Sequence, residues 1–392
     1  SGGSAFKAVR GEYGSGKTFF VRWLQERAKQ RGFAAAEVQI SETETPLHKL
    51  ETVYRRFMER LSTGSSQPGA FREIIDAWFY TLEEDVLAAG DMDSLNERQL
   101  MAATSNLMEK RLSSVSRNAP AFAAALRAYR QAMLENDIAL SEGMISWLTG
   151  QPHVTANIKR IAGLKGEVDH FAALSFLQGL LVVLRDSGHP GLVLIMDEVE
   201  TLQRVRGDVR DKGLNSLRQL VDEIDAGRFP GLYLVITGTP AFFDGPQGVK
   251  RLAPLAQRLH TDFSTDPKFD NPRAVQIRLK GFDLSALLRL GCKIRDIYAT
   301  YSERGERIHS LANEKYMESL ARAVAGNLGG KVGIAPRLFL KKLVGDVLDR
   351  IDQFPDFDPK RDYALTFVDS EMGEVERSAF SVKDVDEIEL RL

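Results

Sequence analysis

Eight residues near the start of the chain match a pattern that binds the phosphates of a nucleotide. Gly11 to Thr18 read GEYGSGKT, which fits G-x-x-x-x-G-K-[ST], the Walker A motif. Glycines allow a tight turn in which successive N–H groups point inward at an anion. Lys17 is expected to reach the outer phosphates and the Thr18 hydroxyl to bind Mg²⁺. The nucleotide-contacting residues expected here are Gly11, Glu12, Tyr13, Gly14, Ser15, Gly16, Lys17, Thr18 and Phe19.

Two carboxylates follow an apolar run much later in the chain. Residues 192–196 read LVLIM and precede Asp197 and Glu198, which resembles a Walker B motif. We expect Asp197 to hold Mg²⁺ directly or through water, because this ion prefers oxygen ligands. We expect Glu198 to polarise the water that attacks the γ-phosphate. The alternative, in which both acids merely cap the next helix, stays open from the sequence alone.

Hydroxyl groups end a further apolar run at residues 232–236. Thr237 is the first choice for a side chain that hydrogen-bonds the γ-phosphate or the attacking water, and Thr239 is the second. A plain Gly-Thr-Pro turn at the end of a strand is the alternative interpretation.

Arginines further along the chain could stabilise the charge that develops on the phosphates. Arg258, or alternatively Arg251, is expected to reach the γ-phosphate of a neighbouring subunit, a role that requires an oligomer. Arg337, at the start of a helix, is expected to approach the nucleotide from a lid. Each could instead be an arginine paired locally on the surface.

The elements needed to position these residues follow an α/β pattern. The short apolar runs at residues 5–9, 33–40, 192–196 and 232–236 predict strands, and the segments between them contain helices. The continuous run at 192–196 is typical of a central parallel strand buried on both faces. We therefore predict an α/β fold of the P-loop NTPase type, AAA+-like, with a doubly wound parallel sheet.

Helical periodicity without strands marks two further regions. The expected organisation is an ATPase core at residues 1–69 and 166–280, an all-helical insertion at 70–165, a helical lid at 281–352, and a C-terminal tail at 353–392 without an assigned role. Within the core we expect helices at 19–31, 46–61, 171–186 and 214–224, and in the tail weak strands at 364–368 and 378–382.

Composition limits the remaining possibilities. The chain has 392 residues and a net charge of −2, so any contact with DNA must use a local patch. One such patch could be the basic stretch at 204–218, for which a solvated loop is the alternative. The single cysteine, Cys292, and the absence of a long apolar run favour a cytoplasmic protein without a membrane segment. Because the chain begins close to its first strand, we expect residues that contact the adenine base upstream of residue 1.

The order of these parts resembles that of AAA+ ATPases of the initiator and STAND-like group. Three segments resemble more closely a bacterial family, the BrxD-like ATP-binding proteins of BREX and phage-growth-limitation loci. These segments are RGEYGSGKTFFVRWLQERA (10–28), EVQISETETPLHKLETVYRRFMERLST (37–63) and AFREIIDAWFYTLEEDVLAAG (70–90). The resemblance implies a role in antiviral defence, a DNA-handling context and protein partners such as a helicase-like protein.

The function expected from these observations is that of an oligomeric, Mg²⁺-dependent ATPase that couples ATP or ADP binding to a partner, on DNA. The family's function carries over residue by residue only to Lys17, Thr18, Asp197 and Glu198. A nucleotide-gated adaptor with little turnover is the alternative. A DNA translocase is a third possibility that the near-neutral charge disfavours. The polar stretch SETET at residues 41–45 receives no role from this chemistry.

Overall fold

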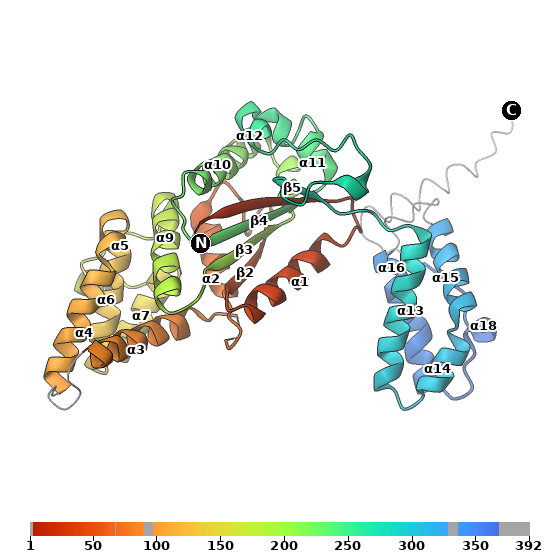
Figure 1. The fold of residues 1–392 in the computed structure, drawn as a ribbon, viewed down its shortest axis with the longest axis horizontal. Helices are drawn as coiled ribbons and strands as arrows, with labels where there is room; N and C mark the ends of the chain where they lie inside the picture. The colour runs from red at the N-terminus through yellow and green to blue at the C-terminus, as the bar shows by residue number, and fades with distance from the viewer. Residues whose placement is uncertain (1–2, 67, 90–96, 328–335, 368–392) are drawn as a thin grey trace. The chain divides into compact units, whose positions relative to one another are not determined.

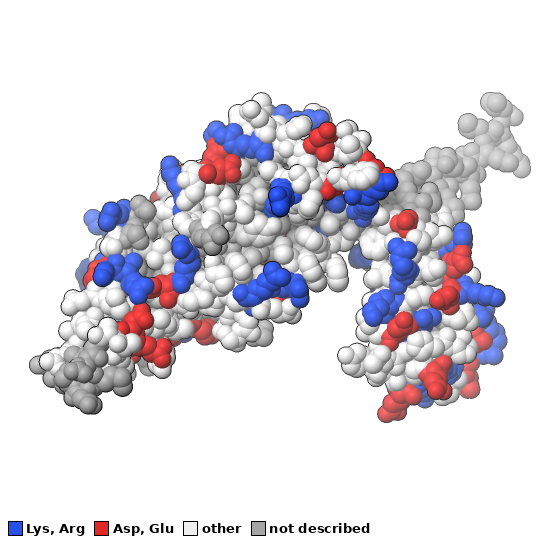
Figure 2. Space-filling view, viewed as in Figure 1, with Lys and Arg blue, Asp and Glu red and all other residues white. Residues whose placement is uncertain are grey.

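The computed structural model describes residues 3–66, 68–89, 97–327 and 336–367. The chain divides into two compact units, one of residues 1–10 with 18–277 and the other of residues 11–17 with 278–392. Within the described residues, none of the helices combines the length and the apolar character needed to cross a bilayer. On the face drawn in Figure 2, basic and acidic side chains are interspersed, with no continuous basic surface.

A five-stranded sheet forms the centre of the first unit (Figure 1). Its order is β2-β3-β4-β1-β5. The strands are β1 (Ala5–Arg10), β2 (Ala34–Gln39), β3 (Leu192–Asp197), β4 (Leu232–Gly238) and β5 (Gln276–Arg278). The pairs β2–β3, β3–β4 and β4–β1 are parallel, and the Ala8 N–H donates to the Val275 C=O beside β5. The mixed α/β fold with a parallel sheet is as predicted and is consistent with a P-loop NTPase.

The strand order places a topological switch between β1 and β4. The connection after β1 leads across the sheet to β2, whereas the connection after β4 passes over β1 to β5. In open parallel sheets, ligands bind at the carboxyl ends of the strands beside such a switch. The carboxyl end of β3 lies on this same side of the sheet. All six residues of β3 are buried, as its unbroken apolar run predicts.

Helices lie on both sides of this sheet (Figure 1). They are α1 (Lys17–Gln30), α2 (Leu50–Arg60), α9 (His170–Asp186) and α10 (Gly207–Asp225). The expected helix at 46–61 begins later, at Leu50, because a hydrogen-bonded turn from Lys49 N–H to Pro46 C=O precedes it. The basic stretch at 204–218 lies mostly on α10 and not on a loop. Shorter elements follow: η1 (Val199–Gln203), α11 (Pro240–Asp244), η2 (Val249–Arg251), α12 (Ala253–Arg258) and η3 (Pro267–Phe269).

The described residues between α2 and α9 form six helices. They are α3 (Phe71–Ala89), α4 (Glu97–Arg111), α5 (Ser113–Asn118), α6 (Pro120–Leu134), α7 (Ile138–Leu148) and α8 (Ala156–Ile161). Their buried side chains, including Trp78 and Phe122, belong to one hydrophobic cluster with Phe57 of α2, Phe176 of α9 and Leu194 of β3. These helices and the sheet thus share a continuous core.

The second unit has a hydrophobic core of its own. Its helices are α13 (Leu284–Tyr301), α14 (Gly305–Leu311), α15 (Glu314–Asn327), α16 (Pro336–Lys341), a π-helical stretch η5 (Lys342–Leu348), α17 (Asp349–Gln353) and α18 (Pro359–Asp362). Phe357, Tyr363, Leu365 and Phe367, from the segment assigned to the tail, pack against this core. Residues 364–367 form no strand, which corrects the expectation there, and the expected strand at 378–382 lies outside the described residues.

Candidate active site

The glycine-rich loop joins the end of β1 to the start of α1. Gly16 adopts a φ of +87°, a conformation that favours glycine. A Cβ on Gly11 would lie only 2.3 Å from Ser15 Oγ, so a larger residue at position 11 would force the Ser15 side chain to shift. The loop therefore has the tight backbone turn that the motif predicts.

The polar side chains of this loop are held inside it. Lys17 is buried, and its ammonium donates to the carbonyls of Gly11 at 2.9 Å and Glu12 at 3.4 Å. The Ser15 hydroxyl is buried and has no hydrogen-bond partner among the described residues. An unsatisfied buried hydroxyl costs free energy that a bound anion would recover.

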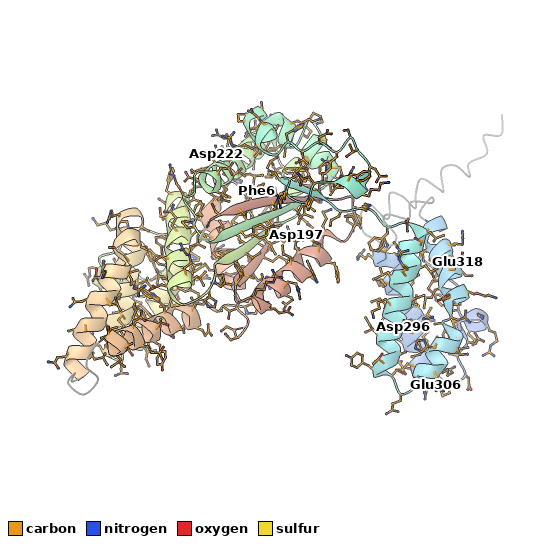
Figure 3. All side chains as sticks on the ribbon, in the orientation of Figure 1. Phe6, Asp197, Asp222, Asp296, Glu306 and Glu318 are labelled. Atoms are coloured by element: carbon orange, nitrogen blue, oxygen red, sulfur yellow. The ribbon has the colours of Figure 1, made fainter. Side chains whose placement is uncertain are left out.

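Thr18, the first residue of the motif inside the first unit, contacts the acidic strand. Its hydroxyl donates to Asp197 Oδ2 at 3.1 Å. Asp197 ends β3 in the interior of the unit (Figure 3) and is only 3% exposed. The structure thus brings together the two residues that the sequence assigns to Mg²⁺, although they lie far apart in the chain.

Thr237 joins Asp197 to Glu198. The register of β3 and β4 sets Met196 opposite Ile236, so the next residues on the two strands are neighbours. The Thr237 hydroxyl donates to Asp197 Oδ1 and accepts the N–H of Glu198 at 3.0 Å. Because Thr237 is fully buried, this hydroxyl fixes both acidic residues at the end of β3. Thr239 instead caps α11, where its side chain accepts the N–H of Phe242.

Glu198 has an unusual backbone. Its φ of +59° and ψ of +42° lie in the left-handed region, which residues other than glycine adopt at a cost of about 1–3 kcal/mol. The turn directs the chain from β3 into η1, where Arg210 of α10 donates to the carbonyls of Leu202, Gln203 and Val205.

Gln39 is a residue of this site that the sequence analysis missed. It ends β2, whose parallel register sets it opposite Asp197, and its amide nitrogen donates to Glu198 Oε2 at 2.9 Å. A polar residue at the end of the strand beside the acidic strand was the available signal, but only the strand order shows that β2 and β3 are neighbours.

The electrostatic surroundings of Asp197 favour a cation. Burial and the charge of Asp197 raise the pKa of Glu37 on the neighbouring strand, while Arg22 and Arg60 oppose the shift. Together with the Thr18 hydroxyl, the Asp197 carboxylate offers adjacent oxygen donors, the ligand type that Mg²⁺ prefers. The unpartnered Ser15 hydroxyl and the glycine turn suit a phosphate. The residues present therefore fit Mg²⁺ and a nucleotide.

The arginines expected to act on phosphates have various surroundings. Arg258 forms an ion pair with Asp222, and Arg251 forms a bidentate pair with Asp211, both on α10. Arg337 is exposed at the start of α16 in the second unit. Phe19, next to Thr18, is 77% exposed. Sequence reasoning gave no sign of the two ion pairs, because it could not place α10 beside residues 251–258.

Comparison with known protein families shows which family the chain belongs to. A model described as "BREX system ATP-binding protein BrxC/D" matches residues 1–367. The chain belongs to the BrxC/D family. This family consists of ATP-binding proteins of BREX phage-defence systems. The resemblance of the three sequence segments to BREX ATP-binding proteins is thereby confirmed. The match includes all the site residues described above. A comparison with curated proteins found no match.

Proposed function

We propose that this BrxC/D-family protein is a Mg²⁺-dependent ATPase of a phage-defence system. One observation carries the proposal: hydrogen bonds connect Thr18 of α1 with Asp197, Thr237 and Glu198 at the carboxyl ends of β3 and β4. These residues can fill three roles of a phosphoryl-transfer site: the metal-binding hydroxyl, the metal-binding carboxylate and the catalytic base.

Each residue has a separate task in this proposal. Lys17 and the N–H groups of the loop bind the β- and γ-phosphates, and Thr18 and Asp197 hold the metal ion. Bound Mg·ATP would supply a phosphoryl group made more reactive by charge neutralisation. Glu198 accepts a proton from the attacking water, and Thr237 keeps Asp197 and Glu198 in place. Arg337, on the helical unit that we propose as a lid, contacts the nucleotide.

A nucleotide-gated switch with little turnover is the second candidate function. One observation favours it. Arg258, the proposed trans-acting arginine, is paired with Asp222 of its own chain. In this alternative, ATP binding recruits a helicase-like or modification protein of the defence system, and hydrolysis serves only to reset the switch.

Partners and assembly belong to the same proposal. An arginine supplied in trans requires a homo-oligomer, and Arg258 can serve only if its pair with Asp222 opens on assembly. DNA is proposed as the setting in which the partners act. The net charge of −2 and the interspersed surface charges favour contact through a local patch or through the partner.

The experiment that tests the proposal combines single-turnover ATP hydrolysis with mass measurement of the full chain. If the chain is an ATPase, it should form oligomers with a non-hydrolysable ATP analogue and hydrolyse ATP in a Mg²⁺-dependent reaction. A chain that stays monomeric and binds ATP without turnover would support the switch. Lys17→Ala should lose nucleotide binding, while Lys29→Ala, at the other end of α1, should retain it. Nucleotide binding unchanged in Lys17→Ala would exclude both candidates.

A further inference from the structure

The strand β2 lies at the edge of the sheet and has unused hydrogen-bonding groups. The N–H groups of Ala34 and Ile40 donate to β3-side carbonyls, so the alternate residues 35, 37 and 39 direct their backbone groups outward. Ala35 exchanges two hydrogen bonds with Ser62, at 2.8 and 2.9 Å. The Gln39 carbonyl accepts from Thr45 Oγ1. Among the described residues, the N–H and C=O of Glu37 and the N–H of Gln39 have no partner.

These backbone groups face a groove of about 930 Å³ between α1 and α2. Its lining side chains come from α1, from the SETET turn and from α2, with the edge of β2 between them. The lining residues are Arg22, Gln25, Glu26, Lys29, Glu37, Gln39, Ser41, Thr43, Glu44, Thr45, Arg56, Arg60, Ser62 and Pro68. Exposed strand edges pair readily with added strands unless they are covered. Among the described residues, this edge is covered at Ala35, by the bridge to Ser62, and at the Gln39 carbonyl, by Thr45.

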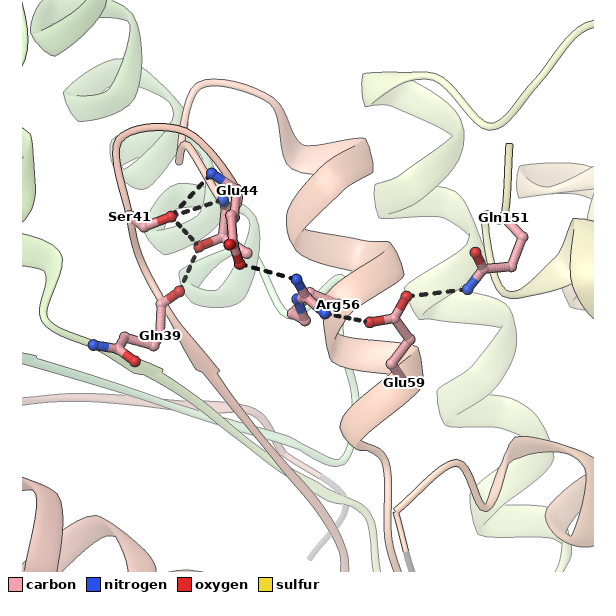
Figure 4. Close-up of polar contacts among 7 residues, drawn as sticks. Gln39, Ser41, Glu44, Arg56, Glu59 and Gln151 are labelled. Atoms are coloured by element: carbon pink, nitrogen blue, oxygen red, sulfur yellow. Dashed lines mark hydrogen bonds and ion pairs between the residues drawn. The ribbon is translucent and has the colours of Figure 1, made fainter. Parts of the chain in front are cut away.

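The SETET turn, whose hydrogen bonds are drawn in Figure 4, lines one side of this groove. The Ser41 hydroxyl accepts the N–H groups of Glu44 at 3.1 Å and Thr45 at 3.0 Å. Glu44 pairs with Arg56 of α2, which also pairs with Glu59. The turn is thus connected to α2 and needs no ordering when a ligand enters.

The charges of the groove leave one cation for a ligand. Lys29 pairs with Glu26 at 2.5 Å, Arg56 pairs with Glu44 and Glu59, and Arg22 lies 3.8 Å from Glu37. Arg60, at the end of α2, has no carboxylate within ion-pair distance among the described residues. It is exposed beside the unpaired segment of β2.

We propose that the edge of β2 at Glu37 and Gln39 binds an extended segment of a partner protein by strand addition, with an acidic side chain of that segment on Arg60. Two N–H donors and one C=O acceptor on one strand match a polypeptide backbone. Among the described lining residues, three of the four cations pair with carboxylates, so only Arg60 remains for the phosphates of a nucleic acid. A groove between two helices admits a single extended strand more readily than the folded sheet of a second copy.

The proposed segment would act directly on the active site. Gln39 presents its backbone N–H to the groove and its side-chain amide to Glu198. A strand bound to that N–H fixes the backbone that carries the amide, and so links partner binding to the proposed base. This regulatory consequence rests on the proposed function, whereas the binding of the segment does not.

The test uses the full chain and a display library of random linear nine-residue peptides. Selected peptides should contain Asp or Glu and lack Pro at the pairing positions. Hydrogen exchange of the Glu37 and Gln39 amides should slow at least about tenfold on binding, as expected when exposed N–H groups enter a ladder. Because binding and exchange are read without ATP, their failure is separable from a failure of the proposed ATPase activity.

Matched variants identify the site. Glu37→Pro removes an outward N–H that makes no hydrogen bond within the fold, and an edge strand tolerates proline at such a position. The variant should weaken peptide binding at least about tenfold. Arg60→Ala should weaken it similarly, and it decides the question if Glu37→Pro fails to fold. Arg27→Ala, on α1 but outside the groove, should bind like the parent chain.

Four results would overturn the proposal. They are the absence of any peptide that protects the two amides, unchanged binding in both groove variants, protection that rises with the concentration of the chain alone, and salt-dependent protection by single-stranded DNA in place of peptides. The third would assign the edge to a second copy and the fourth to nucleic acid.

Discussion

The side-chain amide of Gln39 lies 2.9 Å from Glu198 Oε2, which ties the proposed catalytic base to the end of the neighbouring strand. The hydrogen bond fixes one carboxylate oxygen and leaves the other available for water. Gln39 is therefore a positioning residue, acting through Glu198.

Replacement of Gln39 by Ala should lower kcat for ATP hydrolysis about tenfold, a loss of about 1.4 kcal/mol in transition-state stabilisation. The dissociation constant for a non-hydrolysable ATP analogue should not change, because the loop and Lys17 are intact. Steady-state kinetics and nucleotide titration together measure this split. A rise in the dissociation constant with an unchanged kcat would contradict the positioning role.

Glu198→Gln removes the proposed proton acceptor but keeps the shape of the side chain. General-base catalysis contributes about 10²–10⁴-fold, so single-turnover hydrolysis should slow by at least about 100-fold while ATP still binds. The nearby Glu200→Gln serves as the control and should hydrolyse ATP like the parent. Comparable turnover in Glu198→Gln would exclude this residue as the base.

Thr237→Val should destabilise the first unit, because it leaves Asp197 Oδ1 and the Glu198 N–H without their buried partner. The expected loss is about 1–3 kcal/mol in the free energy of unfolding. Thr237→Ser retains the hydroxyl and should recover most of that loss. Urea denaturation of both variants measures the difference, and equal stability of the Val and Ser variants would show that the hydroxyl has no structural role.

Glu37→Gln should change the dependence of stability on pH. Burial and Asp197 raise the pKa of Glu37 in the folded chain, so its protonated form is favoured there. The associated stability is complete below the unfolded pKa, near 4.5, and is lost as pH rises through the higher folded value. The neutral variant should therefore gain stability over the parent at pH 7.5 but not at pH 4.

Denaturation at the two pH values measures that gain. Glu26→Gln, on the exposed part of α1, is the matched control. A gain from Glu37→Gln that is larger at pH 4 than at pH 7.5 would contradict the assigned sign.

The central elements could be predicted because their sequences carry strong local signals. The apolar run before Asp197 is typical of a central strand, and the glycines before Lys17 favour the turn that follows β1. The contact of Thr18 with Asp197 was expected because the two motifs predict a shared Mg²⁺ site. Local patterns were sufficient wherever an element is long, apolar or marked by a motif.

Contacts that depend on which strands are neighbours, and on which charged side chains pair, could not be predicted in the same way. The contact of Gln39 with Glu198 depends on β2 lying beside β3, which no local pattern encodes. The pairing of Arg258 with Asp222 depends on the packing of α12 against α10. The three-residue strand β5 is too short to give a periodic signal.

The hydrophobic cluster shared by helices α3–α9 and the sheet has a consequence for how the first unit melts. Removal of these helices would leave Phe57 and Leu194 facing water, so the helices cannot be excised as an independent cassette. Sheet and helices should lose their structure in a single calorimetric transition. Heat or mutation that loosens the helical layer would therefore also unfold the sheet that carries the proposed ATP site.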